Sequence, residues 1–180
     1  MRLAFALLVA LALTMVPSPA AAVGGPSNIV IATNHTDARL TIRANAQVTR
    51  EPGMVAAPQN FAFASASCAD CQTIAVALQL NFAGRDARYI APQNVAVATN
   101  DECSNCTTIA LAYQVFLTVD DPTAMPDGVR DVMQDFDAEL RAVSTDPNVT
   151  LAEAESRIVA VVARFMTFAT AMDEQRSVGE

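Results

Sequence analysis

The four cysteines of this 180-residue chain are the residues whose type and spacing most directly suggest chemistry. They occur as two Cys-x-x-Cys pairs, Cys68–Cys71 and Cys103–Cys106. Three chemistries are compatible with this arrangement: structural disulfides, four thiolate ligands for one zinc ion, and thiol redox catalysis. Because each chemistry needs a different structural setting, the segments that carry the cysteines decide between them.

Each cysteine pair lies in the middle of a repeated segment. Residues 58–82 read PQNFAFASASCADCQTIAVALQLNF, and residues 92–117 read PQNVAVATNDECSNCTTIALAYQVFL. Residues 28–48 are a more divergent copy without cysteines, in which Thr36 and Arg39 stand at the cysteine positions. Since one copy has the turn without the thiols, the repeated object is the strand–turn–strand unit, and the cysteines reinforce two copies of it.

Alternating small and bulky side chains predict two β-strands around a tight turn in every copy. In the second copy Ala75 lies on the small-residue face and Ile74 on the bulky face, whereas Arg43 and Asn45 replace alanines in the first copy and make its small face wetter. We therefore predict three β-hairpins that form one antiparallel sheet with a bulky face and an alanine-rich face. One extra residue before Cys103 predicts a bulge in the last copy.

A tight hairpin turn favours a disulfide within each pair. Residues that flank such a turn lie within disulfide-forming distance, and export exposes them to an oxidising environment. Of the three possible pairings we favour Cys68–Cys71 and Cys103–Cys106, because each repeat is then self-contained. The zinc alternative uses all four thiolates but lacks the glycine that usually follows the second cysteine of a zinc knuckle. Redox catalysis is favoured least, since it calls for a Cys-x-x-Cys pair at a helix N-terminus.

The N-terminal residues predict export. Met1–Arg2, an apolar run from Leu3 to Val16 and the small residues up to Ala22 have the layout of a secretory signal peptide cleaved after Ala22. An N-terminal membrane anchor is the alternative, but the run is short for a bilayer span. We therefore predict a secreted or extracytoplasmic protein with no membrane span in the mature chain. The net charge of −8 and the lack of lysine argue against nucleic acid and anionic membranes as partners.

Two amphipathic helices follow the repeats. Apolar residues recur at helical spacing over 129–143, and Thr150–Glu153 is a capping box that opens a second helix. The sequence thus predicts an α+β fold in which a C-terminal two-helix hairpin packs on the bulky face of the sheet. The predicted boundaries are 1–22 for the signal peptide, 23–122 for the three-hairpin region, 123–173 for the helical hairpin and 174–180 for a flexible tail.

The other polar residues fit structural roles better than catalytic ones. His35, the single histidine, is expected to be exposed beside a turn. Each cysteine-containing hairpin should close its open end with an amide pair, Asn60 with Gln79 and Asn94 with Gln114. A set of acidic residues should form a solvated helix face rather than a cation site; its members are Asp127, Asp131, Asp135 and Asp137. These residues predict neither an enzyme nor a cofactor.

The two Cys-x-x-Cys units, with their Ala-x-Ala strands and the Thr-x-Ala-x-Ala-x-Gln run, resemble a family of uncharacterised secreted bacterial proteins, chiefly actinobacterial. Segments similar to them are attached to proteins labelled as membrane zinc metallopeptidases. The resemblance covers about Asn28 to Phe116 and implies no known activity. The peptidase function does not transfer, because the chain has no His-Glu-x-x-His motif.

The sequence therefore favours a secreted, non-enzymatic binding or accessory domain that two disulfides stabilise at its turns. Its alanine-rich face, with Ala75 and Ala110 near the centre, is the predicted surface for an unknown protein partner or for self-association, because small side chains permit close approach. The alternative is a zinc-binding module or a thiol-redox protein built on the four cysteines.

Overall fold

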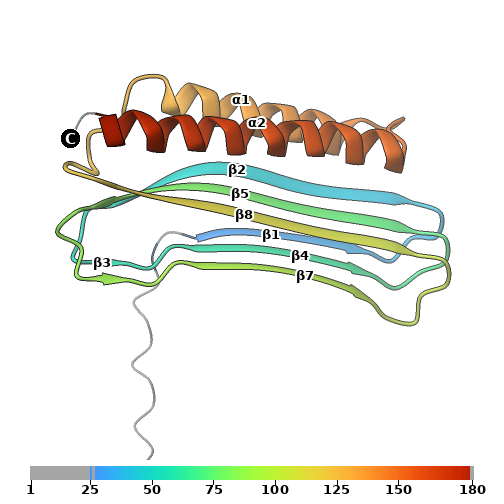
Figure 1. Ribbon diagram of the computed structural model, residues 1–180. Coiled ribbons are helices and arrows are strands. Elements are labelled where there is room, and N and C mark those ends of the chain that lie inside the picture. The colour runs from blue at the N-terminus through green and yellow to red at the C-terminus, as the bar shows by residue number, and fades with distance from the viewer. Residues whose placement is uncertain (1–24, 26, 179–180) are drawn as a thin grey trace, which may run out of the picture.

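The computed structural model describes Gly25 and residues 27–178, and Figure 1 shows the arrangement of their strands and helices. The predicted signal peptide and its cleavage site after Ala22 lie outside the described residues. The strands are β1 (Ser27–Asn34), β2 (Leu40–Glu51), β3 (Val55–Ala56), β4 (Gln59–Ala66), β5 (Gln72–Gly84), β6 (Tyr89–Ile90), β7 (Gln93–Asn100) and β8 (Thr107–Val119). The helices are α1 (Val129–Thr145) and α2 (Leu151–Val178).

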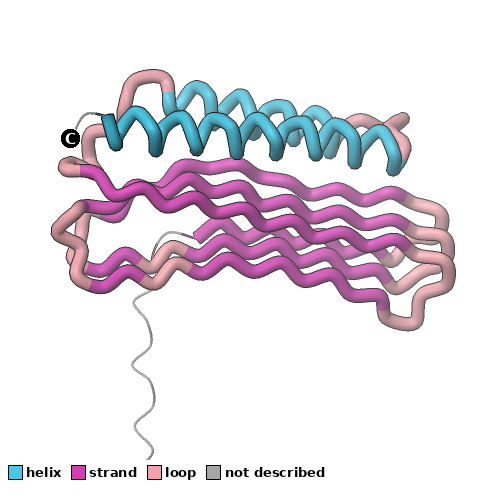
Figure 2. The backbone as a smooth tube through the Cα atoms, in the orientation of Figure 1, coloured by secondary structure: helices cyan, strands magenta, loops and turns pink. Residues whose placement is uncertain are grey.

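The strands form three parallel sheets. Sheet A has the order β1-β4-β7, sheet B has the order β2-β5-β8, and the short sheet C joins β3 to β6. Figure 2 shows the layers, with the two helices on one side, sheet B in the middle and sheet A on the other side. The predicted α+β class with two C-terminal helices against a sheet is confirmed.

The predicted antiparallel hairpins are wrong. The two strands of each repeat lie in different sheets, and each pairs in parallel with the same strand of the next repeat. Antiparallel hairpins and parallel stacking of the repeats require the same alternation of small and bulky residues, so the alternation could not distinguish between the two arrangements. A period of 32 to 35 residues between paired positions is, however, the signature of a solenoid whose repeats stack on one another.

Identical residues stack in register from one repeat to the next. Asn28 lies beside Asn60, which lies beside Asn94, and Ile42, Ile74 and Ile109 form another such row. Each strand thus gives its backbone hydrogen bonds to the neighbouring repeats, while its partner within the repeat faces it through side chains. The three repeats are therefore three rungs of a short β-solenoid.

The turns stack together with the strands. The predicted turn at Asp37–Ala38 is confirmed, and Ala38, Asp70 and Asn105 share a left-handed backbone with φ of 54°, 56° and 55°. Short polar side chains support this conformation in the later two turns. The extra residue of the third rung lies before its turn, where Glu102 also has a positive φ of 48°.

Two layers of apolar side chains flank sheet B. Its bulky residues face the helices in the larger core, and the small residues of sheets A and B meet in an alanine layer. Ala62, Ala64, Ala75 and Ala77 in that layer are fully buried, and Ala110 is partly buried. The alanine-rich face is therefore an internal contact between the two sheets, which corrects its prediction as a docking surface.

The helices cover sheet B and contact each other. Phe136 of α1 meets Phe165 of α2 edge to face at 6.1 Å, and the side chain of Thr150 accepts a hydrogen bond from the backbone of Glu153, as the capping box predicts. The last helix continues to Val178 instead of ending at residue 173. Neither of the described helices combines the length and the apolar character that a membrane crossing requires.

Candidate functional site

Stacking of the turns brings the four cysteines together at one end of the strands. The backbone N–H of Asp70 donates to the carbonyl of Ser104, and that of Thr107 donates to the carbonyl of Cys71. These bonds hold the second turn directly on the third. Arg39 precedes β2 as Cys71 precedes β5, so the first rung places an arginine where the others place a thiol.

Each Cys-x-x-Cys pair has its sulfur atoms at disulfide distance. The Cα atoms of Cys68 and Cys71 are 5.9 Å apart, and those of Cys103 and Cys106 are 6.0 Å apart, both within the range that disulfides span. Cys71 is fully buried and Cys68 is 9% exposed, whereas the other pair is half-buried. The difference follows from position, because the second rung is covered on both sides and the third on one.

The two pairs are also close to each other. The Sγ atom of Cys71 is 3.2 Å from that of Cys106 and 3.9 Å from that of Cys103. The sulfur atoms of Cys68, Cys71 and Cys106 all lie within 4.8 Å of one another, a spacing that could hold a metal ion. The sequence predicted these four residues as one constellation, and the structure places them together.

The setting of the cysteines does not match that of a redox-active pair. Reactive Cys-x-x-Cys thiols gain their low pKa from a helix N-terminus or from a neighbouring cation. Here both pairs lie in turns between β-strands and not at a helix N-terminus, and Asp70 of the second turn accepts a hydrogen bond of 2.6 Å from Asn105 of the third. The geometry thus supports covalent or metal-bound sulfur better than a reactive thiolate.

A ladder of asparagine side chains runs through the interior between the sheets. Asn45 donates to Asn28 at 2.7 Å, Asn28 donates to Asn60 at 3.0 Å, and Asn60 donates to Asn94 at 2.9 Å. Gln114 likewise donates to Gln79 of the neighbouring rung at 2.8 Å. The predicted asparagine–glutamine pairs within each hairpin are therefore replaced by like-with-like pairs between rungs.

The remaining sequence candidates have structural roles. His35 is exposed, and its Nδ1 lies 2.5 Å from the hydroxyl of Ser67 in the next rung. Asp137 of the acidic helix face accepts a hydrogen bond from the backbone of Ala46 at 3.2 Å and binds Arg141 at 2.6 Å. Asp137 therefore protects the outer edge of β2, where its carboxylate accepts a backbone N–H.

One buried carboxyl group lies at the end of β2. Glu51 is 6% exposed, and its Oε1 has no hydrogen-bond partner among the described residues. Desolvation raises the pKa of this carboxyl above its ordinary value of 4.5, because burial penalises the charged form. Glu51 is the last residue of β2, at the end of the strand opposite the turn, so we assign it no part in the cysteine site.

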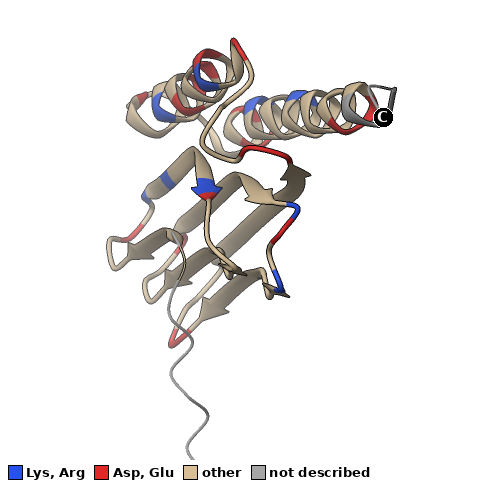
Figure 3. Ribbon diagram, turned by 90° about the vertical axis from the view of Figure 1, so that its left-hand side faces the viewer, with Lys and Arg blue, Asp and Glu red and all other residues tan. Residues whose placement is uncertain are grey.

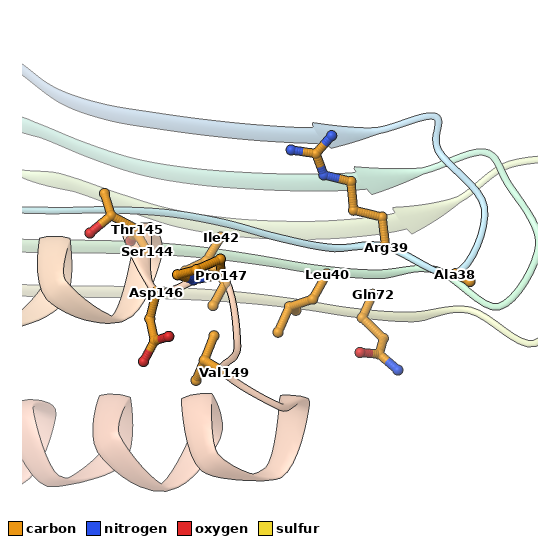
Figure 4. Close-up of a pocket in the computed structure, with 10 residues that line it drawn as sticks. All are labelled: Ala38, Arg39, Leu40, Ile42, Gln72, Ser144, Thr145, Asp146, Pro147 and Val149. Atoms are coloured by element: carbon orange, nitrogen blue, oxygen red, sulfur yellow. The ribbon is translucent and has the colours of Figure 1, made fainter.

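A cleft of about 580 Å³ lies between the first turn and the loop that joins the helices. Figure 4 shows Leu40, Ile42 and Val149 along it, with the guanidinium of Arg39 pointing away from the carboxylate of Asp146. Asp146 instead binds Arg157 at 3.2 Å. Because the polar groups of the cleft do not converge, we assign no ligand to it.

The outer face of sheet A is an exposed surface that sequence reasoning missed. This outer face comprises the side chains that point away from sheet B: Ile29, Ile31, Phe61, Phe63, Val95 and Val97. Ile29, Ile31 and Val95 are 56%, 55% and 43% exposed, and the rings of Phe61 and Phe63 stack 6.4 Å apart between them. The alternation predicted that these residues share a bulky face, but the predicted single sheet has only one such face and places all of them against the helices.

Charged residues avoid this face. Figure 3 shows acidic and basic residues on the helices, the turns and the connections. Within the described strands of sheets A and B, charges occur only in β2, at Arg43, Arg50 and Glu51. The outer face is thus flat, apolar and uncharged.

Comparison of the chain with protein-family models, with curated proteins and with solved structures gave no match.

Proposed function

We propose that this protein is an exported, non-enzymatic binding module that associates through the outer face of sheet A. The observation that carries the proposal is the apolar character of that exposed face, because contiguous exposed apolar patches mark interaction sites. The N-terminal sequence and the two cysteine pairs at disulfide distance support export and oxidation of both pairs. Two short disulfides would each contribute about 2 kcal/mol to stability.

A second copy of the chain is the partner that fits this face best. The face is flat and repeats its side-chain types along three strands in register, so the same patch on another copy is complementary to it under two-fold symmetry. It carries no charge that would oppose a copy of itself. Sheet C adds Val55 and Tyr89, which pair in register and are 48% and 58% exposed.

The size of the face sets the strength of the association. Three strands at a spacing of about 4.8 Å, each eight residues long at about 3.3 Å per residue, give roughly 380 Å² per copy. Stable complexes bury about 800 Å² per partner, so we expect a weak dimer with a Kd of tens of micromolar or more. Added salt should strengthen it, because each copy carries a net charge of −8 and screening reduces their repulsion.

Sedimentation equilibrium between about 10 µM and 1 mM tests the proposal. We expect a concentration-dependent shift to dimer that Ile31→Arg and Phe63→Arg both abolish, because each places a charge in an apolar contact. Ala163→Arg, on the exposed surface of α2, is the matched control and should dimerise as the native chain does. A monomer at every concentration and salt level, or a dimer that survives both outer-face variants, would contradict the proposal.

The proximity of the two cysteine pairs favours a second candidate function, a zinc site in the reduced protein. Thiolates around a tetrahedral zinc ion with Zn–S bonds of about 2.3 Å are about 3.8 Å apart. The sulfur atoms of Cys68, Cys71 and Cys106 lie within 4.8 Å of one another, and that of Cys103 is 3.9 Å from that of Cys71, so the reduced turns need only a local rearrangement to bring four thiolates around one ion. A sulfur atom in a disulfide cannot serve as such a ligand, so the two states exclude each other.

Alkylation with and without reductant, together with metal analysis of the purified protein, separates the two states. The disulfide proposal predicts four cysteines that react only after reduction and no bound metal. Cobalt added to the reduced protein then tests the zinc candidate, which predicts one ion per chain with thiolate charge-transfer bands that Cys71→Ser weakens. Zinc in the purified protein with four alkylatable thiols would overturn the disulfides, and absence of the cobalt bands would overturn the metal site.

A further inference from the structure

The two ends of the solenoid differ because the sheets are staggered by about half a rung. The asparagine ladder shows the stagger directly. The side-chain amide of Asn60 donates to the carbonyls of both Ala77 in β5 and Tyr113 in β8, at 3.0 and 3.1 Å. That of Asn94 donates across the interior to Ala112 of β8 at 3.0 Å. Strand β4 thus lies over the gap between β5 and β8, and β7 extends beyond β8.

The overhang exposes the inner side of β7. The inward residues of β1 and β4 are buried, with Val30 at 6% and Ala62 at 0% exposure. The corresponding Ala96 and Ala98 of β7 are exposed although they occupy the same rows. Strands β1 and β7 are both terminal in sheet A, so the stagger and not the terminal position explains the difference.

The free edge of β8 lies between this overhang and α2. Residues of β8 that face the helices, such as Ile109 and Leu111, are half-buried, whereas Ile74 of β5 is 1% exposed. On the adjoining side of α2, Val159 and Met166 are 61% and 41% exposed. Two hollows of about 220 and 240 Å³ lie along the line where β8 meets α2.

Neither β7 nor β8 carries a device that protects an edge strand. Natural sheets block exposed edges with charges, prolines, bulges or short strands. Strand β8 runs uncharged and without proline for 13 residues, from Thr107 to Val119, and β7 is uncharged and free of proline from Gln93 to Asn100. This end of the stack therefore has the backbone groups and the apolar surface that another strand needs.

We propose that the β7–β8 end binds one extended segment of a partner protein, which adds to sheet B in parallel beside β8. The side chains of the stack define that segment. Positions beside Ala110 and Ala112 must be small, because the layer between the sheets is filled by alanine. Positions beside Ile109, Leu111 and Tyr113 must be apolar, because they face α2. The segment must be uncharged between its ends.

A second copy does not continue the parallel stack at this site. Its first rung would then dock here, and that rung places Arg43 in the row of Ala75 and Ala110. The outer edge of its β2 is covered by α1, and the backbone N–H of Ala46 already donates to Asp137. An arginine in an alanine row is a steric and electrostatic block, so the site accepts a strand that comes without its own helical layer.

Peptides derived from the first rung test the proposal. The probe is a fluorescent peptide of residues 39–51 that carries Arg43→Ala and Asn45→Ala, because residues 43 and 45 are the ones that would lie beside Ala110 and Ala112. The comparison peptide carries Asn45→Ala alone and keeps Arg43. We expect saturable binding of one Arg43→Ala peptide per chain by fluorescence anisotropy, and binding of the Arg43 peptide at least about tenfold weaker. Amide hydrogen exchange should slow in β8 and remain unchanged in β2.

Chain variants locate the site independently of folding. Ala110→Arg should abolish peptide binding, and it should fold because the first rung carries arginine at the same position. Val159→Glu on α2 should weaken binding without altering a strand, while Thr33→Arg on the outer face of sheet A should leave it unchanged. Equal binding of both peptides, no saturable binding, or protection in β2 would overturn the proposal. So would self-association of the native chain that Ala110→Arg abolishes, since it would make a second copy the occupant.

Discussion

The first and third rungs lie at the two ends of this solenoid, yet in sheet B only the first end is protected. At the first end Arg43 and Asn45 replace alanines on the inner side of β2, and Asp137 of α1 accepts the N–H of Ala46. At the third end β7 and β8 keep the small, uncharged pattern of the middle rung. The divergence of the first repeat is therefore its adaptation to a terminal position.

The helical layer also protects the first end of sheet B. Two helices side by side are about 20 Å wide, whereas three strands span about 14 Å. The helical layer is thus wider than the sheet below it, and α1 lies over β2. A repetitive stack that could otherwise grow indefinitely is closed on one side by helix and charge, which are devices that natural sheets use against edge-to-edge aggregation.

Substitution of arginine for alanine in the layer between the sheets should give the largest difference in stability between the second and third rungs. Ala75→Arg should destabilise the protein by roughly 4 kcal/mol or more, because it forces an unpaired charge into a fully buried position. Ala110→Arg should cost less than about 1.5 kcal/mol, since the side chain can reach solvent past β8. Urea unfolding of both variants measures the difference, and equal losses would mean that the third end is as closed as the middle.

The two cysteine pairs should also differ in their contribution to stability, and the buried pair of the second rung should contribute more. In the oxidised protein each short loop contributes about 2 kcal/mol, so replacing Cys103 and Cys106 by serine should remove about that amount. Replacing Cys68 and Cys71 should remove about 1–3 kcal/mol more, because the hydroxyl at position 71 would be buried. Thermal unfolding of the two double variants tests the order. Equal stabilities would show that the second turn is not the more enclosed one.

The asparagine ladder offers a smaller contrast. Asn60→Ala removes hydrogen bonds to Asn94, Ala77 and Tyr113 and should cost about 2–3 kcal/mol, because buried acceptors lose their donor. Asn94→Ala should cost under about 1 kcal/mol, since water can replace the lost bonds at an exposed position. Chemical denaturation again provides the measurement, and a larger loss for Asn94→Ala would contradict the stagger.

The smallest expected effect concerns Glu51 in the first rung, whose counterpart in the third rung is Thr118. Burial raises the pKa of Glu51, so the folded state favours the protonated carboxyl, and its contribution to stability is present below about pH 4.5 and lost as pH rises through the folded-state pKa. Glu51→Gln should therefore raise the Tm at pH 7 and leave it nearly unchanged at pH 4. A variant less stable at pH 7 would show that the ionised carboxylate is stabilising.

Sequence reasoning predicted the units of this fold better than their assembly. Alternation placed Ala75 and Ile74 on opposite faces, the repeat located the turns, and the third copy's extra residue lies where it was expected. Alternation could not tell whether two strands share hydrogen bonds or face each other through alanines, because both put the same side chains on the same face. The outer face of sheet A was missed for this reason, since it exists only when the two strands of a repeat separate into two sheets.

Parallel stacking of the repeats is what gives the molecule its two different ends. Backbone contacts in a nuclear Overhauser spectrum of the labelled protein test this stacking most directly. Parallel stacking predicts contacts between amide and α protons of residues 32 to 35 apart, such as those around Ala62 and Ala96 or Ile74 and Ile109. Contacts between facing α protons within one repeat, as between Ala62 and Ala77, would instead mean antiparallel hairpins and would contradict the account.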